Sequence, residues 1–204
     1  MLDLSVEIMT LGPVSTNCYI VENCAEKSVV VIDPSWDAER IIKQIGERQC
    51  KGVLLTHAHF DHIGALDDIC NHYKVDAYIH VNDAAKLSDP VLNASTQFGY
   101  NVVQTIKPIT FQDKDVIELA GIPFEVMHTP GHSSGSVCFI LPDNLGIFCG
   151  DTLFNGGYGR TDIGDGDFMQ LKQSLRKLMF HTPRVPAFPG HGEMTYAGKE
   201  EKKG

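Results

Sequence analysis

The run THAHFDH at residues 56–62 constrains this chain most, because it places three histidines and one aspartate close together. It directly follows an apolar run at residues 52–55. Imidazoles this close repel one another when protonated, but neutral imidazoles can share a cation. Because side chains alternate along an extended chain, His57 and His59 can face the same side. The run therefore predicts a metal site at the end of a β-strand.

Three more apolar runs are followed by the same kind of side chain. His132, Asp151 and His191 each come after an apolar run and a glycine. Functional sites assemble on the loops that leave strand ends, so we expect these side chains to meet the histidine run. A lone Pro-Gly-His is commonly a turn, and a lone aspartate a helix cap, but their joint occurrence favours one shared site. The predicted metal ligands are His57, His59, Asp61, His62, His132, Asp151 and His191.

Five imidazoles and two carboxylates suit borderline divalent cations, chiefly Zn²⁺, with Fe or Mn as alternatives. Asp61 and His62 come where the chain enters a helix and turns toward a neighbouring point, so one run can serve two metals. Two dications, two aspartates and one hydroxide leave a net charge of about +1, which would attract an electron-rich carbonyl. We therefore expect two divalent metal ions, which would lower the pKa of a shared water to about 7.

The run YGRTD at residues 158–162 contains two candidates for substrate contact. Arg160 can bind an anionic substrate, but an ion pair with Asp162 or Asp165 is the favoured interpretation. Tyr158 either lines a pocket or covers the core.

The remaining histidines lack the context of a strand end. His128 lies four residues before His132 and is predicted to be a buried, hydrogen-bonded neighbour of the site. His72, His80 and His181 are predicted to be surface or capping residues.

Runs rich in Val and Ile alternate with helical runs along the whole chain. Strands are predicted at residues 5–11, 18–22, 28–33, 52–56, 76–80, 115–120, 123–129, 136–141, 145–150 and, as the last strand, 185–190. Helices are predicted at residues 38–48, 62–73 and 167–179, the last with an apolar stripe of Phe168, Leu171, Leu175, Leu178 and Met179. Residues 90–108 are polar and predict a loop with one short helix. Without a Pro/Gly-rich linker, residues 1–204 predict one domain of two packed sheets with helices outside.

Composition excludes several classes of partner. The net charge of −9, with Lys and Arg scattered, argues against a nucleic-acid surface. The six cysteines form no C-x-x-C pair, which favours reduced thiols and a cytoplasmic location. The first ten residues carry Asp and Glu without a basic flank, so no signal peptide is expected, and no apolar run is long enough to span a membrane.

The motifs THAHFDH, TPGHSSGS, GDTLF and FPGHGE, in this order, resemble those of the metallo-β-lactamase-fold hydrolases, and most closely the glyoxalase II-like branch. The resemblance runs from about Val6 to Gly192 and implies an α/β fold, a four-layer αββα sandwich with a dinuclear metal site at one edge. It implies a first metal bound by His57, His59 and His132, a second bound by Asp61, His62 and His191, and Asp151 between them. Glyoxalase II itself continues into a C-terminal helical region that binds glutathione, whereas this chain ends at Gly204 and resembles a short form.

The expected function is metal-dependent hydrolysis of a small-molecule thioester, of the hydroxyacylglutathione type, by a metal-bridging hydroxide. Asp61 is the predicted catalytic residue, because it would orient the hydroxide as well as bind metal. One alternative is a persulfide dioxygenase that holds a single iron with His57, His132 and Asp151. The other is a lactonase or another small-ester hydrolase on the same fold.

Overall fold

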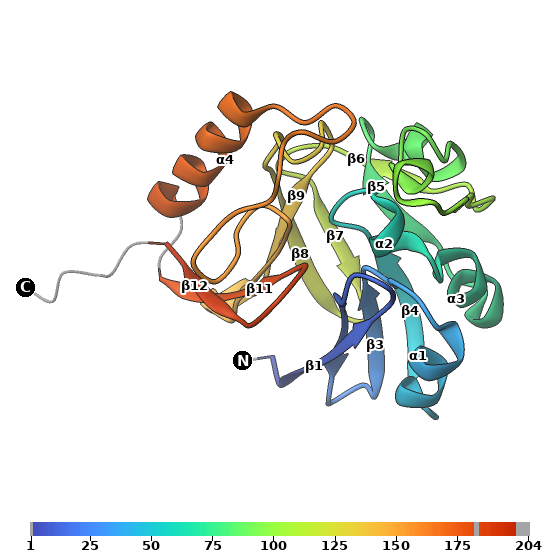
Figure 1. The fold of residues 1–204 in the computed structure, drawn as a ribbon. Helices are drawn as coiled ribbons and strands as arrows, with labels where there is room; N and C mark the ends of the chain where they lie inside the picture. Colours follow the sequence, from blue (N-terminus) through green and yellow to red (C-terminus); the bar gives the residue numbers. More distant parts are fainter. Residues whose placement is uncertain (1, 182–183, 199–204) are drawn as a thin grey trace, which may run out of the picture.

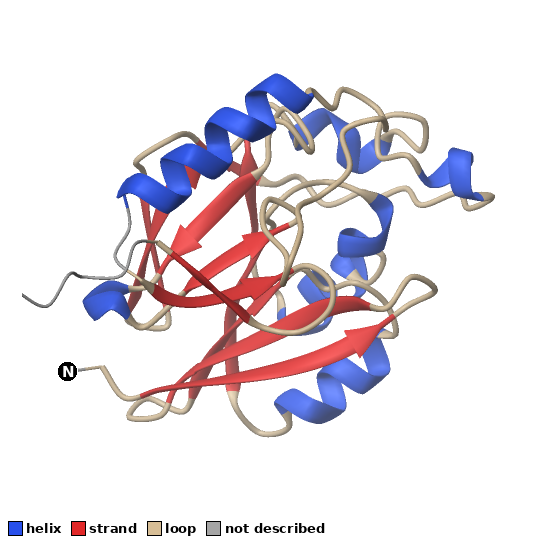
Figure 2. Cartoon of the chain, turned by 60° about the vertical axis from the view of Figure 1, so that its left-hand side comes forward, coloured by secondary structure: helices blue, strands red, loops and turns tan. Residues whose placement is uncertain are grey.

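Two six-stranded sheets form the centre of the molecule, and the helices lie outside them (Figure 1, Figure 2). The computed structural model describes residues 2–181 and 184–198. The first sheet has the order β1 (Leu4–Leu11), β2 (Thr16–Asn23), β3 (Ser28–Ile32), β4 (Gln49–Leu54), β5 (Ala77–His80) and β6 (Ile109–Phe111). The second has the order β12 (Thr195–Ala197), β11 (Val185–Pro189), β10 (Ile147–Gly150), β9 (Val137–Ile140), β8 (Ile122–His128) and β7 (Val116–Leu119).

Strand direction determines where the connecting loops meet. From β3 to β6, each strand of the first sheet pairs with the next in parallel. In the second sheet β10 and β11 are parallel, and the other pairs are antiparallel. The carboxyl ends of parallel neighbours lie at the same edge of a sheet, so the loops after β3, β4 and β5 leave from one edge.

Helices cover the outer face of each sheet, which gives four layers in the order αββα. The first sheet is covered by α1 (Ala38–Ile45) and α3 (Leu66–Tyr73), and the second by α4 (Phe168–His181) (Figure 1). Shorter elements complete the fold: α2 (Phe60–Ile63) and the 3₁₀ helices η1 (Ala84–Ser88), η2 (Ser95–Phe98) and η3 (Pro142–Asn144). The predicted α/β class and four-layer sandwich are confirmed.

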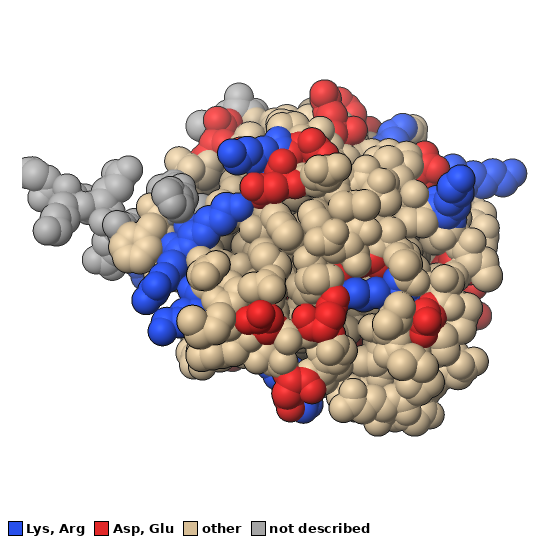
Figure 3. Space-filling model, turned by 90° about the horizontal axis from the view of Figure 1, so that it is seen from above, with Lys and Arg blue, Asp and Glu red and all other residues tan. Residues whose placement is uncertain are grey.

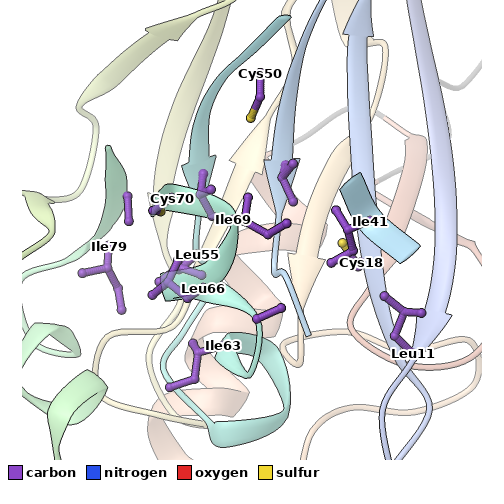
Figure 4. Close-up of a cluster of buried hydrophobic side chains, with 14 of the residues drawn as sticks. Leu11, Cys18, Ile41, Cys50, Leu55, Ile63, Leu66, Ile69, Cys70 and Ile79 are labelled. Carbon is purple, nitrogen blue, oxygen red and sulfur yellow. The ribbon is translucent and has the colours of Figure 1, made fainter. Parts of the chain in front are cut away.

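Three apolar clusters hold the layers together. Strand β3 shows how: Val29 and Val31 point into the cluster beneath α1 and α3, whereas Val30 and Ile32 point into the cluster between the sheets. This strand is buried on both faces, which explains its unbroken run of apolar residues. Figure 4 shows part of the outer cluster, where Ile69 packs beside Leu55 and Leu66. The third cluster joins α4 to the second sheet through residues such as Leu178.

The structure differs from the predicted elements in three places. The helix predicted at 62–73 is two helices, because the Ala65 N–H donates to the Pro34 carbonyl at 2.9 Å instead of continuing the helical ladder. Strands β6 and β12 were not predicted, so β11 is not the last strand. On α4 the buried stripe is narrower than predicted, since Phe168 and Met179 are exposed.

The chemistry of the surface and of the cysteines follows the composition. The six cysteines are free, and all except Cys24 are buried. On the face drawn in Figure 3, basic side chains lie in separate groups with acidic and uncharged residues between them. In the described parts of the chain, no helix has both the length and the apolar character that crossing a bilayer requires.

The outer cluster generates a stability prediction. Ile69 on α3 is fully buried, whereas Ile8 on β1 is 52% exposed. We expect Ile69→Ala to lower the free energy of unfolding by about 2–5 kcal/mol, because it leaves a cavity. The matched Ile8→Ala should cost less than about 1 kcal/mol. Urea unfolding in the presence of a chelator measures both, and equal losses would contradict the assigned packing.

Candidate functional site

The structure brings all seven predicted ligand residues to one edge of the two sheets. Their possible donor atoms form three overlapping groups, within each of which all atoms lie within 4.8 Å of one another. The groups are His57, His59 and His132; His57, His62 and Asp151; and Asp61, His62 and His191. His57, His62 and Asp151 are therefore placed between the two outer sets.

Both sheets contribute to this cluster through the loops at their strand ends. His57 and His59 follow β4, and Asp61 and His62 lie in α2 directly after them. The second sheet supplies the other three ligands, which follow β8, β10 and β11 and are His132, Asp151 and His191. All are buried except His191, whose side chain is 27% exposed.

Several donor atoms of the cluster lie farther apart than the atoms of a good hydrogen bond, although His59 Nδ1 lies 2.8 Å from His132 Nε2. His132 Nε2 lies 3.2 Å from His57 Nε2 and 3.4 Å from Asp151 Oδ2. His62 Nε2 lies 3.4 Å from Asp151 Oδ1, and neither atom has a hydrogen-bond partner although both are buried. Ligands about 2.0–2.1 Å from a tetrahedral Zn²⁺ are about 3.3–3.4 Å apart. The donors of this site are thus placed as they would be around a cation.

Asp33, which was not among the predicted residues, fixes His62. Its carboxylate accepts hydrogen bonds from the Thr56 amide at 2.8 Å and the Thr56 hydroxyl at 2.6 Å. Asp33 Oδ2 also lies 2.9 Å from His62 Nδ1, which leaves Nε2 directed at the cluster. A carboxylate on the far ring nitrogen fixes the tautomer and orientation of a metal-binding histidine. Asp33 follows the apolar run of β3 as the predicted ligands follow theirs, so a signal for it was present.

A second buried carboxylate, Asp83, joins the loops from the two sheets. It accepts hydrogen bonds from the Ala58 amide at 2.9 Å, the Ser133 hydroxyl at 2.8 Å and the Gly135 amide at 2.8 Å. Lys86 Nζ lies 2.7 Å from the same carboxylate. Ala58 separates His57 from His59, and Ser133 follows His132. Asp83 therefore fixes the backbone on which the three histidines of one group are placed.

The N-terminal hairpin fixes the last ligand loop. Asn17 donates its side-chain amide to the carbonyls of Pro189 and Gly192, at 3.0 and 2.9 Å, on either side of His191. The Thr16 hydroxyl donates to Asp61 Oδ2 at 2.7 Å. The start of β2 therefore positions ligands from both sheets, and no sequence pattern indicated this.

Two of the glycines that precede ligands are needed for different reasons. Gly131, before His132, has a φ of +133°, and a β-carbon there would also overlap the backbone of Leu171. Gly190, before His191, has no positive φ, but a β-carbon would overlap Asp151 Oδ1. The first glycine permits a turn, and the second permits the close approach of two ligand loops.

The electrostatics separate the two ends of the cluster. Burial, together with the neighbouring imidazoles, lowers the pKa of His57 well below its usual range and that of His59 to about 3. Burial also lowers the pKa of His62, but Asp61, Asp151 and Asp33 outweigh it and raise the pKa well above the usual value. One end of the site thus has neutral imidazoles, whereas His62 holds a proton that a metal would displace.

Both aspartates of the cluster stay ionised. Burial raises the pKa of Asp151, but His132 and His62 outweigh this and lower the pKa to about 2. Asp61 is affected in the same way by His62 and His191, and its pKa also falls below the usual range. Metal binding requires ionised carboxylates, so these groups are in the state that a cation needs.

The cluster forms the floor of a pocket with a volume of about 360 Å³. The floor consists of His59, Asp61, His132, Asp151 and His191. The walls are mostly apolar and consist of Val14, Phe60, Ala94, Phe98, Phe154, Tyr158, Arg160 and Ile163. A larger cavity of about 640 Å³ lies away from this site, between α4 and the second sheet, and contains none of the cluster residues.

Of the other residues singled out in the sequence, some lie as predicted and others do not. Arg160 forms the expected two-pronged ion pair with Asp162, at 2.7 Å from both its Nε and its Nη2. His128 is half-buried and its Nε2 donates to the Ser134 carbonyl at 2.9 Å. His80 was predicted to be a surface or capping residue. Its Nδ1 accepts from the Asn82 amide at 3.3 Å, but it is 4% exposed, because its ring stacks on His128 across the two sheets, with centroids 4.1 Å apart.

Among the remaining histidines, His72 is exposed, as predicted. The side chain of His181 lies outside the described residues. Arg160 and Tyr158 both line the pocket, so their contact with a substrate stays a prediction.

A four-layer αββα sandwich with a His/Asp cluster at its strand ends defines a class of metal-binding hydrolases. Residues 11–191 match the family model of the metallo-beta-lactamase superfamily, and the chain belongs to this superfamily. The fold and the cluster together imply divalent metal ions at this edge.

Individual relatives cover nearly the whole chain. It is 33% identical to the protein named hydroxyacylglutathione hydrolase GloC of Haemophilus influenzae, over 98% of this chain and 96% of the relative. Two solved structures, each 33% identical and with 94% of both chains covered, are similar in fold. They are the BLEG-1 B3 metallo-beta-lactamase, with a TM-score of 0.89, and TTHA1623 in a di-iron-bound form, with a TM-score of 0.83.

The Asp83 network generates a second prediction. Asp83→Ala would leave two buried amides and the Ser133 hydroxyl without their acceptor, and Lys86 with Asp165 as its remaining carboxylate. Each lost buried partner costs about 1–3 kcal/mol, so we expect the free energy of unfolding to fall by about 3–5 kcal/mol. Asp68→Ala, at an exposed position on α3, should cost less than about 1 kcal/mol. Chemical denaturation with a chelator present measures the difference, and similar losses would show that Asp83 does not tie the loops together.

Proposed function

We propose that the cluster binds two divalent cations. His57, His59 and His132 would hold the first, and Asp61, His62 and His191 the second. Asp151 would bind both, because its two oxygens lie 3.4 Å from His62 Nε2 and 3.4 Å from His132 Nε2. The observation that carries this proposal is the pair of buried, unpartnered atoms, His62 Nε2 and Asp151 Oδ1, at ligand spacing. A buried polar atom without a partner costs about 1–3 kcal/mol, and a cation would satisfy both.

The chemistry we propose is hydrolysis of a small thioester. When bound, the cations would supply a nucleophile by ionising water and would polarise the carbonyl. The name of the Haemophilus influenzae relative supports a thioester of the S-acylglutathione type, and the pocket above the cluster gives such a carbonyl access to it.

The chain's own residues fix where the reacting groups lie. Asp61 lines the pocket, and the Thr16 hydroxyl holds its Oδ2. Because the pKa of Asp61 is depressed, its carboxylate is a weak base at neutral pH, and its role is to orient water as a hydrogen-bond acceptor. The His132 ring is fixed through Nδ1, which donates to the Arg160 carbonyl at 2.7 Å, so Nε2 faces the cluster.

Zinc is the metal we favour for this donor set, with iron or manganese as alternatives. The di-iron-bound form of a relative is the observation that keeps iron in consideration. Iron together with oxygen uptake on glutathione persulfide, and no thioester turnover, would favour the dioxygenase that uses His57, His132 and Asp151. Turnover of lactones in place of thioesters would favour a lactonase.

Metal content and thioester turnover test the proposal together. We expect about two equivalents of metal per chain after loading. We also expect the loaded protein to hydrolyse S-lactoylglutathione, which is measured as the decrease in thioester absorbance. His59→Ala removes a donor that lies 2.8 Å from His132 Nε2, so we expect it to lower kcat by more than about 100-fold.

His72→Ala is the matched control, because His72 is exposed on α3 and outside the cluster. It should keep both the metal and the rate. Full activity of His59→Ala, or a protein that takes up no metal, would refute the dinuclear site.

A further inference from the structure

The polar segment at residues 89–104 forms one wall of the pocket. It contains Ala94 and Phe98, which line the pocket beside the cluster. Of this segment only η2 is regular, yet buried side chains hold it in one conformation. Asn93, which is fully buried, donates to the Val102 carbonyl at 2.8 Å and accepts from the Ser95 amide at 3.0 Å. Such bonds pre-order a surface before a ligand arrives.

The same segment is joined to the metal-binding run. The Phe60 amide donates to the Asn93 carbonyl at 3.0 Å, directly between His59 and Asp61 in the sequence. Ser95, also fully buried, donates to the Pro90 carbonyl and accepts from the Val102 amide, both at 3.1 Å. The wall therefore has a fixed position relative to the reacting centre.

Phe98 is the exposed aromatic ring of this segment that lines the pocket, and it packs against neighbouring rings. Phe60 stacks on Phe98, with centroids 5.3 Å apart, and on Tyr100, at 5.4 Å. Phe98 is 40% exposed, and Val14, which also lines the pocket, is 42% exposed. Large apolar side chains held rigidly at the mouth of a pocket mark a surface that a ligand covers.

The charges around the pocket also favour an apolar ligand. Apart from the residues of the cluster, Arg160 is the one charged side chain among the described residues that line the pocket. Its guanidinium already makes a two-pronged ion pair with Asp162. Away from the cluster, the described lining therefore offers a charged group no cation that lacks an acid beside it. The wall is better suited to an uncharged, apolar group.

We propose that Phe60, Phe98 and Val14 select thioesters that carry an aryl or bulky alkyl group next to the reacting carbonyl. This inference rests on the proposed function, because it names the substrate class of the same site. In the reaction, water adds to the carbonyl, a C–O bond forms, and the C–S bond breaks to give a carboxylic acid and a thiol. The apolar group can belong to the acyl part or to the thiol part of the substrate, and an experiment can distinguish these two possibilities.

Two pairs of substrates distinguish these sources. S-phenylacetylglutathione against S-acetylglutathione varies the acyl part, and S-benzyl thioacetate against S-acetyl-N-acetylcysteamine varies the thiol part. With metal-loaded enzyme, we expect kcat/KM to be at least about tenfold higher for the aryl member of one pair. The pair that shows the preference identifies the part of the substrate that contacts the wall.

Variants connect the preference to the wall. Phe98→Ala should reduce the aryl preference to about threefold or less, since the ring that contacts the aryl group is lost. Phe180→Ala is the matched control: Phe180 is 59% exposed on α4 and does not line the pocket. It should keep the preference of the parent enzyme. Circular dichroism of both variants confirms that they fold.

A binding measurement separates this inference from the reaction. N-benzylacetamide, an uncleaved neutral amide, should give a stronger saturation-transfer NMR signal than N-ethylacetamide, and Phe98→Ala should abolish the difference. Turnover of all four thioesters with equal kcat/KM would overturn the inference and leave the proposed function standing. Binding that depends on Phe98, without turnover of any thioester, would support the proposed apolar contact and refute the proposed hydrolysis. Absence of both would refute both.

Discussion

The constraint on which the rest of the structure depends is that buried imidazoles and carboxylates meet at one sheet edge and leave two of their polar atoms without a partner. His62 Nε2 and Asp151 Oδ1 lie 3.4 Å apart, too far for a good hydrogen bond, and water does not reach them. A chain that only had to fold would place apolar groups there, because burying such atoms opposes folding. The surrounding layers must therefore stabilise the fold enough to hold this edge in place, and their clusters of fully buried Ile, Val and Phe side chains do so. The apolar packing of the layers therefore offsets the free energy that is lost by burying unpartnered polar atoms at the site.

Polar side chains outside the cluster hold it in place, and each has a different part in this. Asp33 orients one ligand through its far ring nitrogen, whereas Asp83 binds the amides of two loops and touches no ligand side chain. Thr16 and Asn17 then connect the first sheet to the last ligand loop. Both sheets thus supply predicted ligands, and residues of the first sheet and its loops also position the ligand loops of the second.

The sequence predicts the ligand positions better than it predicts their surroundings, for a physical reason. A ligand run such as residues 57–62 is local: the pattern, the preceding strand and the chemistry all lie within ten residues. The same local signal marked Asp33, which directly follows an apolar run and was missed only because it was assigned to the strand. The bond from Thr16 to Asp61 spans 45 residues, and nothing near Thr16 indicates its partner. His80 illustrates the same limit, since it is buried by a ring that lies on the other sheet.

The strands and the irregular segment at residues 89–104 contribute different parts of the site. Strand ends place the predicted metal ligands, and because strands such as β3 and β10 are buried on both faces, few substitutions there preserve the fold. The segment at residues 89–104 lies outside the sheets, so its periodicity did not predict its structure, and buried Asn93 and Ser95 fix its course instead. A wall held by two polar side chains can change its outward-facing residues without disturbing the layers beneath. Within one superfamily, the choice of substrate can therefore vary while the edge that carries the chemistry stays the same.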